Sequence, residues 1–418
     1  MEFGISSIML QNTLQLYRNA YSGLSKEIWL LSLVSLINRA GAMVFPFLTI
    51  YLTQILDFSL KDTGFIMSFF GMGSILGSYI GGWLTDRIGD FKVQLWSLIA
   101  SSIILLFLVE ARTFWEFAAI ALTFSIFADA FRPANKVAVA KYSTPENLTR
   151  SFALLRLAIN VGFAIGPAMG GLLAAWKGYE WLFYGDALTC FLAAILFAIT
   201  LSESKEQKQA FKEQLAQVDT STLQSPYKDF FFLTYLLLIA LVAFAFMQLF
   251  FTMPVYFKEG FGLDEGQIGL LMALNGMIIV VTEMPLVYLA ERKMGKFMSM
   301  TLGVFLIGLG FLVYLFPSYW IGIAVLSMVL VTLGEIYYMP FASAFVAERA
   351  EDSNRGQYMA LYTMAWAAAN VIAPTTGFYI SEQFGFKTLW GILFVLGVVC
   401  SFGFWLLGKR HVRGLELV

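Results

Sequence analysis

The sequence predicts an all-α membrane protein of about twelve transmembrane helices, arranged as two six-helix bundles related by pseudo-two-fold symmetry. Three observations support this. The 418-residue chain is 59% hydrophobic and only 13% charged, whereas soluble domains carry about a quarter charged residues. Apolar runs of membrane-spanning length, roughly 17–25 residues, recur along the whole chain. Short motifs in the first half also return in the second half at nearly constant spacing.

The predicted spans follow one another with short polar gaps. We expect them to start near Trp29, Gly64, Val93, Trp115, Ser151 and Trp181, and then near Phe230, Gln267, Phe297, Tyr319, Gln357 and Leu389. Only helices and closed barrels satisfy the backbone in lipid, and these runs are too long and continuous for barrel strands. The residues before Lys26 fit either a short interfacial helix or a disordered tail.

One polar segment, Ser202 to Asp229, is rich in Lys, Glu, Gln and Ser and cannot span a membrane. It divides the chain into an N-terminal six-helix bundle (1–201), a cytoplasmic linker (202–229) and a C-terminal six-helix bundle (230–418). A surface helix around Lys205–Gln217 fits its composition.

The basic residues predict the orientation. With both termini inside, the cytoplasmic segments hold nineteen of the 27 Lys and Arg residues and the opposite side holds five. Lys136, after the fourth span, is counted with the cytoplasmic segments. Because cytoplasmic loops of membrane proteins are enriched in Lys and Arg, we expect a multi-pass protein of the cytoplasmic (inner) membrane with both termini in the cytoplasm.

Several classes of function are disfavoured. A formal net charge of −1 gives no sign of nucleic-acid binding. Cys190 and Cys400 lie in apolar runs, unlike a metal site or a disulfide framework. No His/Cys/Asp cluster, nucleophile elbow or phosphate loop is present, so we expect no catalytic residue, no metal and no cofactor.

Two features are repeated along the chain. The turn Gly82-Trp83-Leu84-Thr85-Asp86-Arg87-Ile88-Gly89 separates the second and third spans, and Ala290-Glu291-Arg292 occupies the equivalent gap in the second half, with the acidic residues 205 positions apart. Pro133 of the fourth span and Pro340 of the tenth are 207 positions apart. Parallel six-helix repeats are a known membrane-protein architecture.

These features resemble the major facilitator superfamily over nearly the full length of the chain. The glycine-bearing turn is similar to that family's loop motif, although Asp90 stands where the family usually has a basic residue. The resemblance implies a monomeric secondary transporter of small molecules that works by alternating access. It also implies a gating role for the residues of the two turns, which are Gly82, Asp86, Arg87, Gly89, Glu291 and Arg292.

The fifth span carries a second family motif. Gly162-x-x-x-Gly166-Pro167-x-x-Gly170-Gly171 resembles the motif associated with drug:proton antiporters. Glycines allow close helix approach and proline bends the helix, so Gly166, Pro167 and Gly170 are expected to act in gating. The alternative is simple membrane packing, because Gly and Pro are common in transmembrane helices.

Five of the charged residues inside predicted spans matter most as candidates: Arg39, Asp129, Arg132, Arg156 and Glu335. An ionised side chain at the bilayer centre costs at least ~2.5–3.5 kcal/mol, so such residues are usually paired and often functional. Asp129 and Arg132 are three residues apart and share a helix face.

The balance between desolvation and a neighbouring cation sets whether a carboxyl group holds a proton. We therefore predict Glu335 and Asp129 as proton-coupling residues, with a static Asp129–Arg132 ion pair as the alternative for the latter. Glu283, about two turns before the second loop motif, is expected to be a gate or packing residue. The predicted substrate-binding and charge-pairing residues are Arg132, Arg156, Arg39, Asn160 and Tyr338.

The leading functional hypothesis is proton-coupled export, or antiport, of small amphipathic organic compounds, driven by the proton gradient without a cofactor. The alternative is a proton-coupled importer of small peptides or related zwitterionic or anionic metabolites. Leu157-Ala158-Ile159-Asn160-Val161-Gly162 resembles the fifth helix of oligopeptide transporters, but only Arg39 remains of their first-helix motif. A receptor-like or scaffolding protein on a transporter fold is a third possibility.

Overall fold

The computed structural model describes residues 2–201, 225–316 and 320–415. The surface helix expected at Lys205–Gln217 lies outside these ranges. The described residues form helices and connecting turns, with no strand among them. The helices of the first half are α1 (Glu2–Tyr21), α2 (Lys26–Ala40), α3 (Val44–Ile50), the π-helix η1 (Tyr51–Ile55), α4 (Leu60–Ile88), α5 (Asp90–Glu110), α6 (Phe114–Lys141), α7 (Leu148–Lys177) and α8 (Glu180–Thr200). Those of the second half are α10 (Phe230–Met247), α11 (Thr252–Phe261), α12 (Glu265–Lys293), α13 (Lys296–Leu312), the 3₁₀ turn η2 (Val313–Leu315), α14 (Ile321–Arg349), α15 (Arg355–Phe384) and α16 (Phe386–Leu415).

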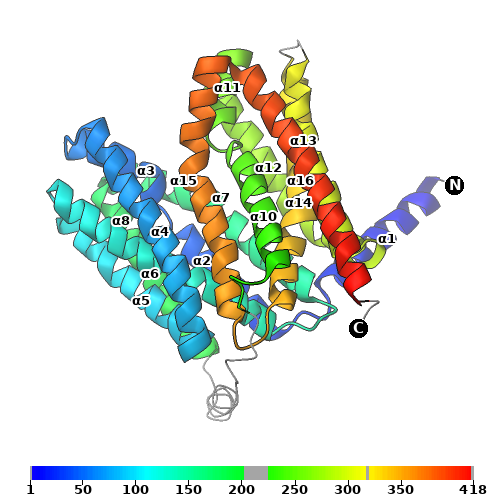
Figure 1. Ribbon diagram of the computed structural model, residues 1–418. Coiled ribbons are helices and arrows are strands. Elements are labelled where there is room, and N and C mark those ends of the chain that lie inside the picture. Colours follow the sequence, from blue (N-terminus) through cyan, green and yellow to red (C-terminus); the bar gives the residue numbers. More distant parts are fainter. Residues whose placement is uncertain (1, 202–224, 317–319, 416–418) are drawn as a thin grey trace.

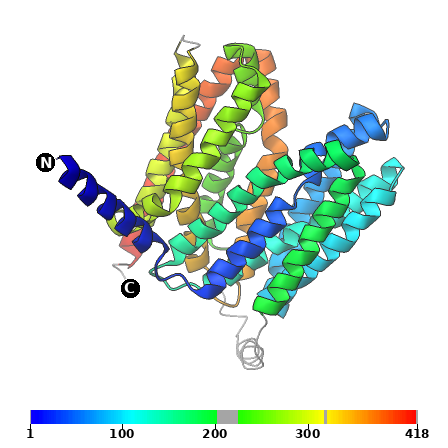
Figure 2. The same ribbon diagram turned by 180° about the vertical axis from the view of Figure 1, so that it is seen from behind.

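The helices gather into two bundles, α2–α8 and α10–α16 (Figure 1). The bundles converge at the end where α8 stops and α10 starts, here called the linker end, and diverge towards the opposite end (Figure 2). Among the described residues, ten helices are long and apolar enough to cross a membrane. The first and eleventh predicted spans correspond to α2–α3–η1 and to α15, which complete the twelve.

The duplication read from the sequence is visible in the helix bounds. Helix α7 covers Leu148–Lys177 and α15 covers Arg355–Phe384, exactly the same length displaced by 207 residues at both ends. Each is preceded by an asparagine whose side chain accepts a hydrogen bond from the backbone three residues earlier, Asn147 from Thr144 and Asn354 from Glu351. The same turn chemistry therefore starts both helices.

The first span is broken in its middle. Helix α2 ends at Ala40, and α3 starts again at Val44. Gly41 lies in this break against the side chain of Thr189 in α8, and a Cβ atom at position 41 would overlap the Thr189 hydroxyl. The glycine is therefore required by the close approach of two helices.

The α7 glycine motif packs on this broken span. A Cβ atom at Gly162 would clash with Arg39 and Leu36 of α2, and Gly166 faces the carbonyl oxygens of Arg39 and Ala40. Pro167 lies inside α7, between the two packing glycines Gly166 and Gly170. The motif thus makes room for a neighbouring helix within the N-terminal bundle, and its predicted gating role remains a prediction.

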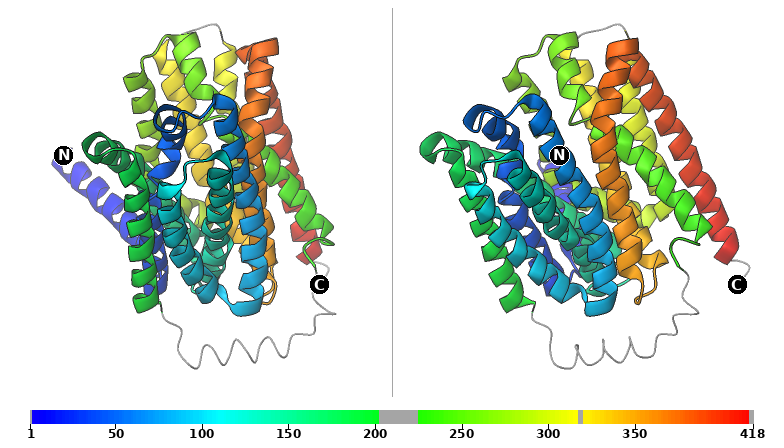
Figure 3. Two further views of the ribbon diagram at one scale, coloured as in Figure 1. Left: turned by 90° about the vertical axis from the view of Figure 1, so that its left-hand side faces the viewer. Right: turned by 60° about the vertical axis from the view of Figure 1, so that its left-hand side comes forward.

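Two further contacts tie the halves together. Helix α1 runs beside the C-terminal bundle (Figure 2), where the Tyr17 hydroxyl donates a hydrogen bond to the Val281 carbonyl oxygen of α12 at 2.5 Å. Helices α4 and α15 lie side by side along the boundary of the bundles (Figure 3). The fold therefore has two kinds of interior: a packed core within each bundle, and the boundary where the two bundles meet.

Candidate functional site

The central feature is an ion-pair network across the boundary of the bundles. Arg156, from α7 of the N-terminal bundle, places Nε 2.6 Å from Glu283 Oε1 of α12 and Nη1 2.7 Å from Glu335 Oε1 of α14. Glu283 and Glu335 are buried, with Glu283 fully inaccessible, and the Arg156 side chain is 12% exposed. One cation thus faces two carboxylates, and with both acids ionised the network carries one excess negative charge.

The hydrogen bonds of the two carboxylates differ. The second oxygen of Glu335 accepts a hydrogen bond from Asn275 Nδ2 at 3.1 Å, and the same amide also contacts Thr332 Oγ1 at 2.9 Å. The second oxygen of Glu283 has no hydrogen-bond partner among the described residues, and the same holds for Arg156 Nη2 and Asn160 Nδ2. Burying a polar atom without a hydrogen-bond partner costs free energy. These atoms therefore have unused hydrogen-bonding capacity for a proton or a bound polar group.

Asp129 and Arg132 form the ion pair expected from their spacing, with Arg132 Nε 2.6 Å from Asp129 Oδ1. Ser125 Oγ donates a further hydrogen bond to Asp129 Oδ2 at 3.3 Å. Asp129 is buried, whereas the Arg132 side chain is 37% exposed. The pair lies within α6 and does not itself join the two bundles.

Arg39 takes another position beside the break in the first span. Its guanidinium lies over the ring of Phe163, 5.5 Å from the centroid. This geometry is a cation–π contact.

The glycine-bearing turn closes the linker end of the boundary. Asp86, at the end of α4, accepts hydrogen bonds from the backbone N–H groups of Gly356 at 2.6 Å and Gln357 at 3.0 Å. These are first-turn donors of α15, and the Gln357 N–H also donates to the Asn354 carbonyl oxygen at 3.1 Å. The helix dipole favours an anion there. Gly82 lies so close to Gly356 that a Cβ atom on either glycine would overlap the other's carbonyl oxygen.

The other two residues of this turn act within α4. Arg87 stacks on Trp83 at 3.8 Å from the ring centroid, and Gly89 ends α4 with φ 91, in the region that favours glycine. The turn therefore combines a cross-bundle contact with a local helix stop.

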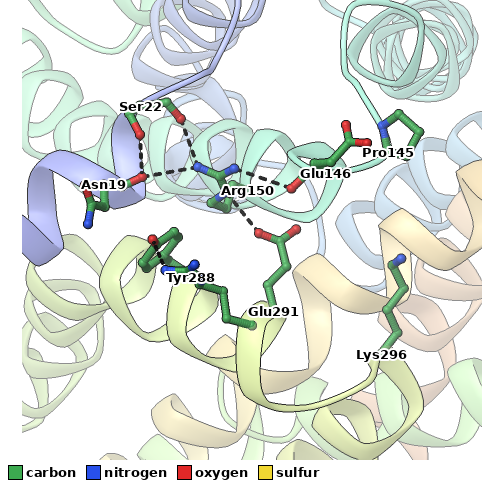
Figure 4. A pocket seen from close by; sticks show the side chains of 9 residues that line it. Asn19, Ser22, Pro145, Glu146, Arg150, Tyr288, Glu291 and Lys296 are labelled. Carbon is green, nitrogen blue, oxygen red and sulfur yellow. Dashed lines mark hydrogen bonds and ion pairs between the residues drawn. The ribbon is translucent and has the colours of Figure 1, made fainter.

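A second closure involves the repeated motif. Arg150 Nε, at the start of α7, lies 2.9 Å from Glu291 Oε2 of α12. Figure 4 shows this pair in a pocket of about 570 Å³, where Arg150 also donates to the carbonyl oxygens of Asn19 and Ser22. Arg292 turns to the hydroxyl of Tyr288, its neighbour four residues earlier.

Asp229 anchors the start of the C-terminal bundle. Its carboxylate accepts hydrogen bonds from Arg349 Nε at 2.8 Å, from the Phe232 N–H at 3.0 Å and from the Tyr358 hydroxyl at 3.2 Å. Burial acts to raise the pKa of Asp229, but the hydrogen bonds and the charge of Arg349 outweigh it and lower the pKa from 3.8. Asp229 is thus held ionised just outside the first span of the second half.

Two predicted residues lie elsewhere than expected from the sequence. Glu283, predicted as a gate or packing residue, belongs to the same network as Glu335. Tyr338 is fully buried against Phe404, 5.8 Å between ring centroids, inside the C-terminal bundle. The structure therefore does not bring Tyr338 to the ion-pair network.

Two polar residues, Asn275 and Asp186, were not identified from the sequence, and a third, Lys136, was assigned to another segment. Asn275 was not singled out, although it is the amide nearest to Glu335. Asp186 is a 5% exposed carboxylate in α8; an acid within an apolar run was the signal that could have found it. Assigning Lys136 to a cytoplasmic segment was wrong, because it lies inside α6 with Nζ 4.1 Å from the ring centroid of Tyr362. The apolar residues that follow Lys136, Val137 to Ala140, continue the helix past it.

Comparison with known proteins gives a consistent result. The family model described as Major Facilitator Superfamily matches residues 28–336 and 256–416. The chain is 26% identical to a Na(+), Li(+), K(+)/H(+) antiporter of Planococcus maritimus, covering 90% of this chain and 95% of that protein. It is 29% identical to the multidrug resistance protein MdtG of Proteus mirabilis, over 39% of this chain and 40% of that protein.

Among solved structures, a bacterial homologue of the iron transporter ferroportin, in an outward-facing state with soaked iron, superposes with a TM-score of 0.73 at 16% identity. That match covers 93% of this chain and 100% of the other. The fold, the family model and the relatives agree with one another. The chain therefore belongs to the Major Facilitator Superfamily and is a multi-pass membrane transporter rather than an enzyme.

Proposed function

We propose that this protein is a proton-coupled antiporter that exports small amphipathic organic compounds. The observation that carries the proposal is the network of Arg156 with Glu283 and Glu335. It joins the two bundles at a buried position and contains one more carboxylate than it has cations. A proton entering the network removes that excess charge.

Protonation is linked to movement because the network crosses the boundary. While both acids are ionised, Arg156 is held to α12 and α14. Once a carboxyl is neutral it interacts with the guanidinium less strongly, so the N-terminal and C-terminal bundles separate more easily. Since an isolated charge in the membrane costs at least ~2.5–3.5 kcal/mol, separation with both acids ionised is strongly disfavoured.

Of the two acids, Glu283 offers the free oxygen. Both oxygens of Glu335 accept hydrogen bonds, whereas Glu283 Oε2 has no partner among the described residues. We therefore assign the transported proton to the Glu283–Glu335 pair rather than to Glu335 alone. Asp129, in the N-terminal bundle, is proposed as a second proton site that contributes to coupling without being obligatory.

The proposed orientation places the linker end and both termini in the cytoplasm, in the cytoplasmic (inner) membrane, with the protein acting as a monomer. Asp86 and Glu291 then close the cytoplasmic side, and Gly82, Arg87, Gly89 and Arg292 support that closure. Opening would require these contacts to break as the bundles rock.

Proteoliposomes containing a pH-sensitive dye test the proposal. Adding cationic ethidium or anionic fluorescein should evoke proton flux in the native protein. Glu335→Gln and Glu283→Gln should each abolish transport driven by a pH gradient. Glu348→Gln is the matched control, because Glu348 pairs with Lys296 at a partly exposed position, 2.7 Å apart. Unchanged gradient-driven transport in both network variants, or no compound-evoked proton flux in the native protein, would overturn the proposal.

The same vesicles address the importer alternative, because the direction of the gradient that drives uptake distinguishes export from import. A second candidate is antiport of alkali cations against protons. It is favoured by the similarity to the Planococcus maritimus antiporter over 90% of the chain. Proton flux evoked by Na⁺ or K⁺ without an organic compound would favour this second candidate.

A further inference from the structure

Lys136 is a lysine without a carboxylate partner inside a predicted membrane span. It lies in α6, within the span Phe114–Lys141. Its ammonium rests on the ring of Tyr362 in α15, across the boundary of the bundles, 4.1 Å from the centroid. Among the described residues no acid forms an ion pair with it, in contrast to Lys141 in the same helix, which pairs with Asp90 at 3.1 Å.

A second cation stands one helical turn earlier. Arg132 shares a face with Lys136, four residues apart, and their like charges are close enough to repel. Arg132 also repels Arg39 of α2. In the part of the chain that the structure describes, the one ion pair of these three cations is that of Arg132 with Asp129, while Asp129 and Asp186 also attract Arg39. Three cations thus face two acids, so positive charge is in excess along this strip of the N-terminal bundle.

Aromatic rings border the strip on both sides of the boundary. Tyr362 contacts Lys136 from the C-terminal bundle, and Phe163, 50% exposed, lies under the guanidinium of Arg39. The Arg132 side chain is itself 37% exposed. Accessible cations beside apolar rings suit a ligand with one charged end and a flat apolar body.

We propose that Lys136, together with Arg132, binds the anionic group of the transported compound, and that the substrates are organic anions, carboxylates above all. A bound carboxylate would supply the counter-charge that Lys136 lacks and would relieve its repulsion with Arg132. Tyr362 and Phe163 would contact the apolar body. This proposal narrows the substrate class of the proposed transporter. It rests on that function, but it concerns a strip separate from the negatively charged network of Arg156.

Binding at equilibrium tests the proposal without any proton gradient. The full-length protein in nanodiscs is titrated at pH 7 by calorimetry with benzoate, 2-naphthoate and cis,cis-muconate, and with the neutral amide of each. The native protein should bind at least one carboxylate about tenfold more tightly than its amide, the effect of one charge-assisted hydrogen bond. Lys136→Gln should remove that preference and leave amide binding unchanged, while Lys136→Arg should retain most of it.

Lys177→Gln is the matched control. Lys177 also rests on an aromatic ring, that of Trp176 at 4.4 Å, but lies exposed at the end of α7. It should leave carboxylate binding unchanged. If Lys136 only holds the bundles together through Tyr362, Lys136→Gln will weaken carboxylate and amide equally, and this overturns the proposal. Absence of binding by all three carboxylates overturns it as well. Loss of proton flux in Glu335→Gln with carboxylate binding intact would separate the coupling function from this site.

Discussion

Arg156 of the N-terminal bundle and Glu283 of the C-terminal bundle are joined by a contact of 2.6 Å between Nε and Oε1. Because Glu283 is fully buried, water does not reach its side chain in this state. In the proposed mechanism this contact holds the two bundles together until a proton neutralises one of the two carboxylates.

Replacing Arg156 tests whether the network depends on its one cation. Arg156→Gln leaves two buried carboxylates without a cation, and breaking a buried pair costs about 3–5 kcal/mol. We expect loss of gradient-driven transport and a lower unfolding temperature in detergent. The Arg156→Gln/Glu283→Gln double variant should lose less stability than the sum of the single variants, because the two residues interact. Additive losses would contradict the network.

Asp129→Asn should behave differently. Its partner Arg132 lies in the same helix, and the Arg132 side chain is 37% exposed. The pair therefore does not have to break when the bundles separate, and water can solvate the arginine. We expect proton-driven flux in proteoliposomes to fall by no more than about fivefold, the equivalent of about 1 kcal/mol for a pair with one partly exposed partner. Complete loss of flux in a folded variant would instead make Asp129 an obligatory proton site.

The linker end should open when its backbone contact is disturbed. Gly356→Ala introduces a methyl group that overlaps the Gly82 carbonyl and the Asp86 carboxylate. Asp86→Asn removes the negative charge of the group that accepts hydrogen bonds from Gly356 and Gln357. Hydrogen bonds to a charged group contribute roughly 1.5–3 kcal/mol. Both changes should shift the population towards a conformation open at the linker end.

Spin labels measure this shift. Lys92, in the first turn of α5, and Arg410, near the end of α16, are both exposed. Labelled through Lys92→Cys and Arg410→Cys, they should show a longer distance distribution in both variants than in the native background. Gly295→Ala, at an open position in the second loop, serves as the control. An unchanged distribution in Gly356→Ala would contradict the close packing of the two glycines.

Asp229 should make stability depend on pH at the acidic end. Its pKa in the folded protein is lowered from 3.8. The ionised Asp229 therefore stabilises the folded protein fully at pH values above its pKa in the unfolded chain. This stabilisation is lost as the pH falls through the lower pKa of the folded protein. Asp229→Asn should cost about 2 kcal/mol at neutral pH through weakening of the Arg349 contacts, while the asparagine side chain can still cap α10.

Tryptophan fluorescence during thermal unfolding in detergent, from neutral pH to about pH 3, checks this. The difference between the native protein and Asp229→Asn should shrink below the ordinary carboxyl value. Asp62→Asn, which alters an exposed first-turn acid of α4, supplies a comparison. A difference that stays constant over the whole range would refute the assignment.

The sequence predicted the helices more fully than their contacts. All twelve spans begin within a few residues of the expected positions, because apolar length and polar gaps are local properties of the chain. The break at Gly41 was not predicted, since it depends on Thr189 of another helix. The Asp129–Arg132 ion pair, which the spacing of the two residues offered as the alternative to a proton site, is present.

The residues of the candidate site could likewise be identified from the sequence, but their contacts could not. Arg156, Glu283 and Glu335 were each identified as polar residues in apolar surroundings, but they come from α7, α12 and α14, and no local pattern shows that they meet. Glu283 was therefore interpreted as a gate or packing residue. Lys136 was assigned to a cytoplasmic segment because the sequence alone does not show how far α6 continues. Its contact with Tyr362 joins the two bundles, so neither half of the sequence predicts it.

The closeness of Gly82 and Gly356 also bears on leakage. Two backbones in contact, with no side chain between them, leave no flexible group that could keep the contact partly made. We therefore expect closure at this end to be sensitive to a single added methyl group. In the proposed alternating-access cycle, a carrier that shuts this tightly would present no continuous pore, so ions would not pass uncoupled from its cargo.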